Sequence, residues 1–112
     1  MNKYFKLAVN IALKRKNNRH YYLGAVGIRN DGKIVMASNI PNQERNVQCH
    51  AETRLSRKID IGTVVYVARV NKSGNIILNA KPCAGCMKHL KSKGAIEVYY
   101  TISNFETGRI EL

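Results

Sequence analysis

The sequence predicts an α/β protein in which helices cover both faces of a mixed β-sheet. Three observations support this fold class. Apolar residues recur at helical spacing near the N-terminus, a turn signal joins the two apolar runs that follow, and the later apolar runs alternate with helix-like segments. The length of 112 residues suits a single core, so we expect one domain spanning residues 1–112.

The first elements are a helix and a hairpin. Residues 2–16 predict an amphipathic helix, because one face carries a row of apolar or small side chains: Tyr4, Ala8, Ile11 and Ala12. Residues 21–29 and 33–38 predict two strands, joined by the hairpin turn signal Asn30-Asp31-Gly32. Gly24 and Gly27 in the first strand indicate a bulge or a close contact with another backbone.

The later elements alternate between helix and strand. We expect a helix over residues 49–59, with Gly62 just past its end, and another over residues 84–93, closed by Gly94. Residues 63–70 form a nearly continuous apolar run, typical of a central strand covered on both faces. The remaining strand candidates are shorter: 96–100, 76–78 and 109–112. The predicted sheet therefore has four to five strands.

The charge of the chain is strongly positive. Lys and Arg total 19 against 7 Asp and Glu, which gives a formal net charge of +12, and Asp31 is the first acidic residue. Such a field attracts polyanions such as nucleic acids. A Lys- and Asn-rich composition also arises from the base composition of a genome, so the charge leaves both explanations open. No apolar run approaches the roughly 18 residues of a membrane span, so we expect no membrane partner.

Two short motifs carry the chemistry. His50-Ala51-Glu52 opens the second predicted helix, and Pro82-Cys83-Ala84-Gly85-Cys86 leads into the third. Three cysteines do not make a disulfide framework, and a Cys-x-x-Cys pair with a distant His indicates a metal site in a reducing compartment. The spacing is that of zinc deaminases acting on nucleobases. We expect His50, Cys83 and Cys86 to bind Zn²⁺ and to leave one coordination position open.

Glu52 is the candidate catalytic residue. It follows His50 by two residues and therefore points to a different side of the helix start, away from the metal ligands. Zinc-bound hydroxide would attack C4 of the base, while Glu52 carries a proton from the water to N3 and helps ammonia to leave. The alternative is a closed structural zinc site completed by His89 or Cys49. Both fit poorly, because His89 lies nearly a turn beyond Cys86 and Cys49 breaks the spacing between ligand and acid.

With these motifs and this order of elements, residues 2–100 resemble the cytidine and deoxycytidylate deaminase superfamily. The resemblance implies a three-layer α/β/α sandwich, zinc ligation by the three residues above and a proton shuttle at Glu52. It also implies substrate contacts at Asn39, which follows the second strand, and at Ala51. Two features differ between branches: His50 stands where free-nucleoside deaminases usually have Cys, and Lys81 stands where the tRNA-adenosine branch has Glu. The short chain resembles compact deaminases of phages and small mobile genomes.

The resemblance and the charge together predict a function. We expect conversion of cytosine to uracil in a cytidine or deoxycytidine nucleotide, with Arg45 and Lys81 as candidate phosphate contacts. The first alternative is the same chemistry on single-stranded DNA or RNA, whose backbone would follow two basic clusters: Lys14, Arg15, Lys16 and Arg19, and Arg54, Arg57 and Lys58. The second is a non-catalytic, zinc-stabilised nucleic-acid binder. We also expect the protein to form a homo-oligomer and to be located in the cytoplasm of a bacterium or of a phage-infected host.

Overall fold

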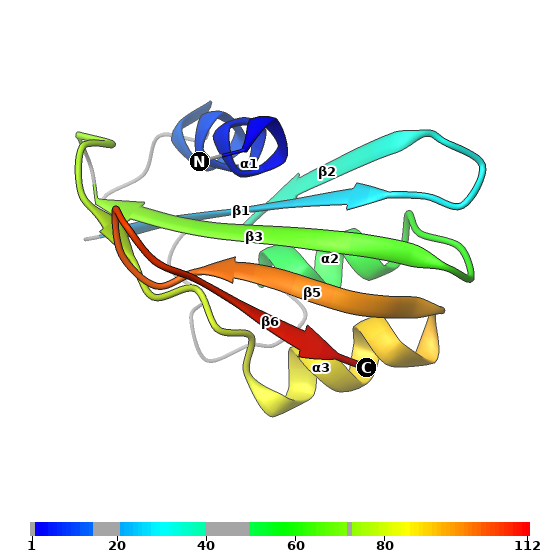
Figure 1. The fold of residues 1–112 in the computed structure, drawn as a ribbon. Helices are drawn as coiled ribbons and strands as arrows, with labels where there is room; N and C mark the ends of the chain where they lie inside the picture. Colours follow the sequence, from blue (N-terminus) through cyan, green and yellow to red (C-terminus); the bar gives the residue numbers. More distant parts are fainter. Residues whose placement is uncertain (1, 15–20, 40–49, 72) are drawn as a thin grey trace.

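The computed structural model describes residues 2–14, 21–39, 50–71 and 73–112. Within these ranges, three helices and six strands follow one another, and Figure 1 shows how they are arranged. Their bounds are α1 Lys3–Lys14, β1 Tyr21–Ile28, β2 Ile34–Ser38, α2 Ala51–Ser56, β3 Thr63–Asn71, β4 Ile77–Leu78, α3 Ala84–Ser92, β5 Ala95–Thr101 and β6 Thr107–Glu111. In the described part of the chain, no helix is long and apolar enough to cross a bilayer.

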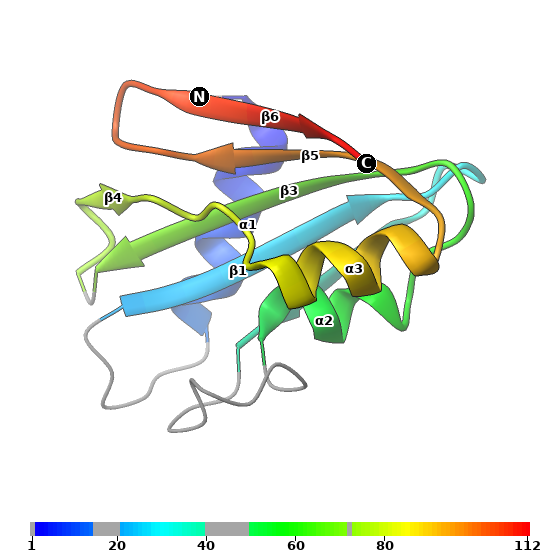
Figure 2. The ribbon, with the colours of Figure 1, turned by 90° about the horizontal axis from the view of Figure 1, so that it is seen from below.

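The six strands form one mixed sheet between two helical layers. The strand order is β2-β1-β3-β5-β6, and β4 pairs with β3 beside this path. Helix α1 covers one face, while α2 and α3 lie side by side on the other (Figures 1 and 2). This confirms the α/β/α sandwich. The sheet has six strands rather than four to five, because both the two-residue β4 and the C-terminal β6 pair with neighbours.

Helix α1 packs very closely on the sheet. Asn2 caps it, since its side-chain oxygen accepts hydrogen bonds from the main-chain N–H groups of Tyr4 and Phe5, both at 3.0 Å. Ala8 and Ala12 are buried as predicted, and Phe5 joins them. At Gly24 of β1, an added Cβ would lie 2.0 Å from the carbonyl oxygen of Ala8. The predicted close backbone contact is therefore the contact with α1.

The predicted hairpin joins β1 to β2. The N–H of Arg29 donates to the carbonyl of Lys33 at 2.9 Å, and Ile28 pairs with Ile34 at the end of the ladder. Gly32 has a φ of 89°, which a residue with a side chain adopts only at a cost. The hairpin leaves β2 at the edge of the sheet, and its last residue leads directly into Asn39.

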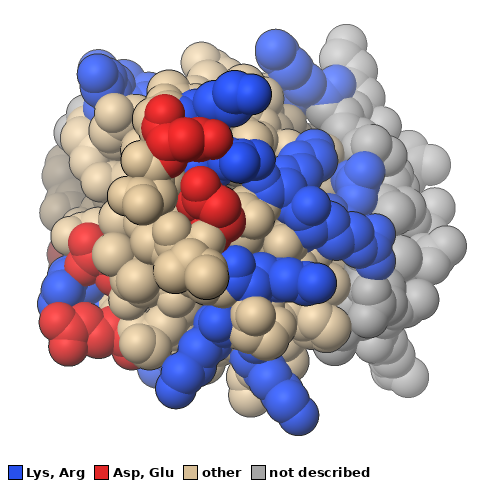
Figure 3. All heavy atoms as spheres, turned by 90° about the vertical axis from the view of Figure 1, so that its right-hand side faces the viewer, with Lys and Arg blue, Asp and Glu red and all other residues tan. Residues whose placement is uncertain are grey.

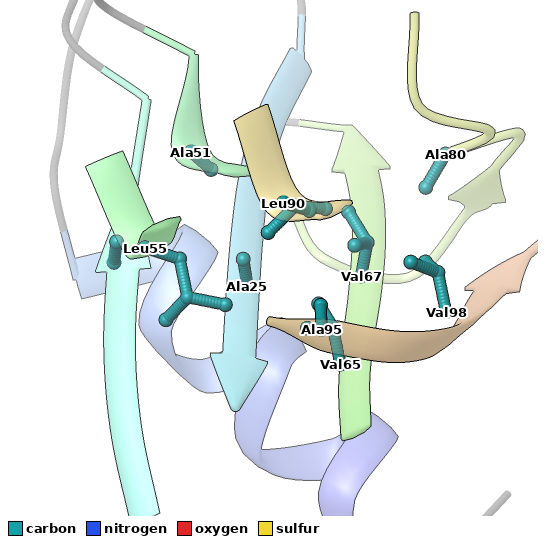
Figure 4. Packing of buried hydrophobic residues seen from close by; sticks show 10 residues of the cluster. Ala25, Ala51, Leu55, Val65, Val67, Ala80, Leu90, Ala95 and Val98 are labelled. Atoms are coloured by element: carbon teal, nitrogen blue, oxygen red, sulfur yellow. The ribbon is translucent and has the colours of Figure 1, made fainter. Parts of the chain in front are cut away.

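The main core lies between the sheet and the two helices that carry the metal motifs. Leu55 of α2 and Leu90 of α3 are fully buried against Val65 and Val67 of β3 and Val98 of β5 (Figure 4). Strands β3 and β5 run parallel. The chain between two parallel strands must cross back over the sheet, and this crossover contains α3. Burial of both faces of β3 confirms that the apolar run is a central strand. The core thus fixes the two helix starts relative to each other.

Helix α2 is shorter than its sequence predicts. It spans Ala51–Ser56 instead of residues 49–59, and Cys49 lies outside the described residues. The chain leaves the helix early because Asp60 is used in a turn. Its carboxylate accepts hydrogen bonds from the N–H of Asn30, at 3.0 Å, and from the hydroxyl of Thr63, at 2.8 Å. These bonds join the turn before β3 to the β1–β2 hairpin.

Candidate metal centre and catalytic pocket

His50, Cys83 and Cys86 come together at the starts of α2 and α3. His50 is the N-cap of α2 and Cys83 is the N-cap of α3, and both have extended backbone conformations. The Cys83 sulfur lies 3.1 Å from that of Cys86, and His50 Nδ1 lies 3.2 Å from the Cys86 sulfur and 3.7 Å from the Cys83 sulfur. All three ligand atoms lie within 4.8 Å of one another.

This donor set fits Zn²⁺. Imidazole nitrogen and thiolate sulfur are its usual ligands, and three protein ligands are typical of zinc sites that keep one position open. Among the described residues, the only group of three or more ligand-bearing side chains at this spacing is His50, Cys83 and Cys86, so His89 does not complete a fourth position. The alternative with Cys49 lies outside the described residues.

The two thiols have different environments. Burial raises the pKa of Cys86, and the nearby charge of Glu52 raises it further. Burial also acts to raise the pKa of Cys83, but hydrogen bonds with Cys86 and His50 outweigh it and lower that pKa below its usual value. One of these bonds is donated by the main-chain N–H of Cys86 at the start of α3, where helix N–H groups favour thiolates.

Glu52 is the buried acid of the site. Its side chain is only 4% exposed, and burial raises the pKa of its carboxyl. Among the described residues its Oε1 atom has no hydrogen-bond partner, although such atoms are rarely left unpaired in a folded protein. With no partner in the described part of the chain, this oxygen is available to hydrogen-bond a ligand in the pocket.

Glu52 lines a small pocket of about 80 Å³. This exceeds the roughly 10–15 Å³ that one water molecule requires. Two cationic residues also line the pocket, so it combines a buried acid with positive charge. The guanidinium of Arg69 donates to the main-chain oxygen of Asn79 at 3.4 Å, which holds it near the pocket. The described lining residues are Leu23, Glu52, Arg69, Asn79, Ala80 and Lys81.

Asn39 lies beside this pocket. It is 3% exposed, and its Oδ1 accepts a hydrogen bond from the N–H of Leu23 at 3.1 Å, while its own N–H donates to the Leu23 carbonyl. Its Nδ2 group has no partner among the described residues. Asn39 therefore presents a buried donor next to a pocket-lining residue, a stronger arrangement for ligand binding than an ordinary turn.

The other predicted site residues have different positions. The side chain of Ala51 is fully buried in the main core, so any substrate contact from this residue falls to its main chain. Lys81 lines the pocket as an exposed residue, and Arg45 lies outside the described residues. Sequence reasoning missed Arg69. Its signal was a single charge within the otherwise apolar run of residues 63–70, a position where a buried strand seldom carries one.

Comparison with known protein families shows to which family the chain belongs. Residues 1–102 match the family described as the cytidine and deoxycytidylate deaminase zinc-binding region. The chain belongs to this deaminase family. All three candidate ligands and Glu52 lie within the matched residues. The family match and the donor set together make this chain a zinc-dependent deaminase.

Solved structures of other deaminases share the fold. The cytidine deaminase from Mycobacterium leprae is 20% identical, with a TM-score of 0.59 over 93% of this chain and 87% of its own. The cytidine deaminase from Mycobacterium tuberculosis is 21% identical, with a TM-score of 0.54 over 84% of this chain and 77% of its own. At these identities the likeness supports the fold of this deaminase. The comparison with curated proteins gives no match.

Proposed function

We propose that this deaminase converts cytosine to uracil in a cytidine or deoxycytidine nucleotide. One observation carries the proposal: the Glu52 carboxylate, one oxygen of which has no partner among the described residues, shares its pocket with the cationic residues Arg69 and Lys81. The acid suits proton transfer to a base, and the cations suit a phosphate attached to it.

Glu52 has the position and the environment for the proton transfers. His50, Cys83 and Cys86 would hold Zn²⁺, which when bound would supply a Lewis acid able to lower the pKa of a water to about 7. Glu52 would accept one proton of the attacking water and give it to N3 of the ring. It would then take the second proton, from the new hydroxyl at C4, and give it to the amino group, which leaves as ammonia. Burial raises the pKa of its carboxyl, which suits it to carrying each proton in turn.

Neighbouring groups would orient the nucleotide. The Nδ2 group of Asn39, which has no partner among the described residues, offers a hydrogen-bond donor to the sugar, and its Oδ1 is already fixed by the N–H of Leu23. Arg69 and Lys81 would bind the 5′ phosphate, for which a guanidinium fork and an ammonium are the usual partners. The main-chain N–H of Lys81 donates to Asn79 Oδ1 at 2.9 Å, which fixes the segment just before Pro82.

Turnover of a set of substrates tests the proposal. Zinc-loaded protein is incubated separately with dCMP, CMP, deoxycytidine and cytidine, and uracil products are measured by mass spectrometry. We expect higher kcat/KM for the monophosphates than for the nucleosides. Glu52→Gln should reduce kcat by about 10²–10⁴-fold while the protein still binds zinc. Equal turnover by Glu52→Gln, or no uracil from any of these substrates, would reject the proposal.

The phosphate contact has its own variant. Lys81→Met should raise KM for dCMP and leave the kinetics with deoxycytidine unchanged, since only the former carries the charge that Lys81 binds. Lys33→Met, an exposed lysine in the β1–β2 turn, removes the same charge elsewhere and serves as control. If both variants raise KM equally, the effect comes from net charge, and Lys81 is not a phosphate contact.

A further inference from the structure

A second, larger hollow lies at the β2 edge of the sheet, outside the catalytic pocket. Its volume is about 480 Å³. It spans both helical layers, because α1 and α2 lie on opposite faces of the sheet and both contribute to it (Figure 1). We call it the β2-edge groove. The described residues that line it are Ile11, Lys14, Met36, Ala37, Ser38, Arg54 and Lys58.

The groove is cationic. Lys14, Arg54 and Lys58 line it, and no Asp or Glu is found among its described lining residues. The ammonium of Lys58 donates to the carbonyl of Met36 at 2.6 Å, and the guanidinium of Arg54 donates to the carbonyl of Ser38. These bonds hold two cations along the edge strand. An ammonium has three donors, so the bond to Met36 leaves Lys58 able to bind a further acceptor.

Each of the three cations has a structural role, but these roles do not explain why all three line one groove. Lys14 lies in the last turn of α1, where a cation stabilises a helix end. Arg54 and Lys58 satisfy carbonyls of an edge strand and thereby oppose pairing with another chain. Three like charges around one hollow nevertheless repel one another, and an anion between them removes that repulsion. The groove is therefore suited to a ligand that carries negative charge.

The β2-edge groove adjoins the catalytic pocket through two short connections. Ser38 lines the groove, and the next residue, Asn39, is hydrogen-bonded to Leu23 of the catalytic pocket. Arg54 follows Glu52 by two residues on α2, so the two side chains leave the helix on different sides. One ligand that extends past Asn39 can reach from one hollow to the other.

We propose that the β2-edge groove binds backbone phosphates of a single-stranded nucleic acid whose target cytosine enters the Glu52 pocket. The identity of that base rests on the proposed function. A nucleotide within a strand keeps its 5′ phosphate for Arg69 and Lys81, and a neighbouring phosphate then meets Lys14, Arg54 and Lys58. The strand must be single, because a base within a duplex is stacked and paired and does not reach such a pocket.

Binding of a labelled oligonucleotide tests the groove. A short cytosine-containing single strand is titrated with zinc-loaded protein, and fluorescence anisotropy gives the affinity at several NaCl concentrations. The variant Lys14→Met with Lys58→Met keeps the aliphatic stems and removes two charges. We expect each removed lysine to weaken binding about two- to fivefold. The slope of log affinity against log salt should fall by about two units, one for each lost phosphate contact.

A charge-matched variant separates the groove from net charge. Lys33→Met with Lys93→Met removes two exposed lysines that do not line the groove. This control should lose much less affinity than the groove variant, and equal losses would overturn the proposal. In a third measurement, inorganic phosphate or dCMP competes with the labelled oligonucleotide for the parent and for the groove variant. If dCMP binding depends on the groove as strongly as oligonucleotide binding does, the groove serves a free phosphate and the strand is excluded.

Uracil formation, followed in the same samples, keeps this proposal separate from the proposed function. Groove-dependent binding without uracil from any substrate retains the groove and rejects the deamination. Uracil formation without groove dependence retains the deamination and rejects the groove. Thermal unfolding of each variant shows whether a loss of affinity reflects a loss of folded protein.

Discussion

Thr53 connects the helix that carries Glu52 to the metal ligands. It is buried, and its hydroxyl donates to the sulfur of Cys86 at 3.6 Å. A hydrogen bond to a ligating thiolate fixes its orientation and adjusts its basicity, and loss of such a bond typically costs about 10–100-fold in metal affinity. We therefore expect Thr53→Val to bind zinc about 10–100-fold more weakly, measured by competition with a chromophoric chelator.

A neighbouring hydroxyl provides the control for Thr53. Ser56 is buried on the same helix, and its hydroxyl donates to the main-chain oxygen of Thr53 instead of to a ligand. Ser56→Ala should leave zinc affinity near that of the parent, whatever it does to stability. Equal zinc affinity in the parent and in Thr53→Val would show that the hydroxyl has no influence on the metal.

The residues of the site differ in how far the sequence reveals them. His50, Cys83, Cys86 and Glu52 belong to short motifs, so their spacing along the chain already determines how they lie at two helix starts. Arg69 reaches the pocket only because β3 passes beneath it in the folded sheet. That contact depends on strand order, which a local pattern does not contain. The sequence also does not reveal that one Glu52 oxygen has no hydrogen-bond partner among the described residues, because this depends on the folded pocket.

The packing of α1 on β1 depends on one glycine. A Cβ at Gly24 would lie 2.0 Å from the Ala8 oxygen and 2.8 Å from the Ala12 nitrogen, and both are backbone atoms that cannot turn aside. Gly24→Ala must therefore displace the whole helix. Overpacking of this kind costs about 1–3 kcal/mol, and each kcal/mol lowers Tm by roughly 4–8 °C in a domain near this size. Thermal unfolding of the zinc-loaded protein measures the loss.

Gly27 in the same strand is the matched control. The three atoms nearest to an added Cβ there are side-chain methyl groups, of Ile59 and Val35 at 3.2 Å and of Thr63 at 3.3 Å. These atoms can shift by a few tenths of an ångström, so Gly27→Ala should lower Tm less than Gly24→Ala. The reverse order would show that α1 tolerates displacement and that its close approach contributes little to stability.

Element ends were harder to predict than the elements themselves. The apolar periods located all three helices and the principal strands, because burial on one or two faces leaves a repeating pattern. The early end of α2 followed from Asp60, whose bonds to Asn30 and Thr63 join segments far apart in the sequence. Strand β4 exists only because its two residues meet Arg69 and Val70 of β3. Both are tertiary effects.

The net charge of +12 acts on the whole molecule. The longest extent of the protein is 34 Å, close to the Debye length of about 30 Å at 0.01 M salt. At low salt, positive groups across the whole protein therefore repel one another, whereas at 0.15 M the interaction is confined to about 8 Å. Figure 3 shows this imbalance on one face, where Lys and Arg side chains are spread widely and acidic ones are fewer.

Screening should therefore stabilise the fold. We expect Tm of the zinc-loaded protein to rise by several degrees between about 0.01 M and 0.15 M NaCl, because the compact state suffers most from self-repulsion. Local ion pairs act in the opposite direction, but those of Arg29 and Arg109 are partly exposed, and such pairs are worth little. A Tm that falls with NaCl would show that these pairs outweigh the repulsion.

The same increase in NaCl that raises Tm should weaken nucleic-acid binding. Oligonucleotide affinity should fall steeply as NaCl rises, because each phosphate contact releases counterions from the strand. If affinity falls over the same NaCl range in which Tm rises, the loss of affinity does not come from unfolding of the protein. If affinity and Tm instead rise together with NaCl, the positive charge does not bind the backbone, and the basic surface reflects composition alone.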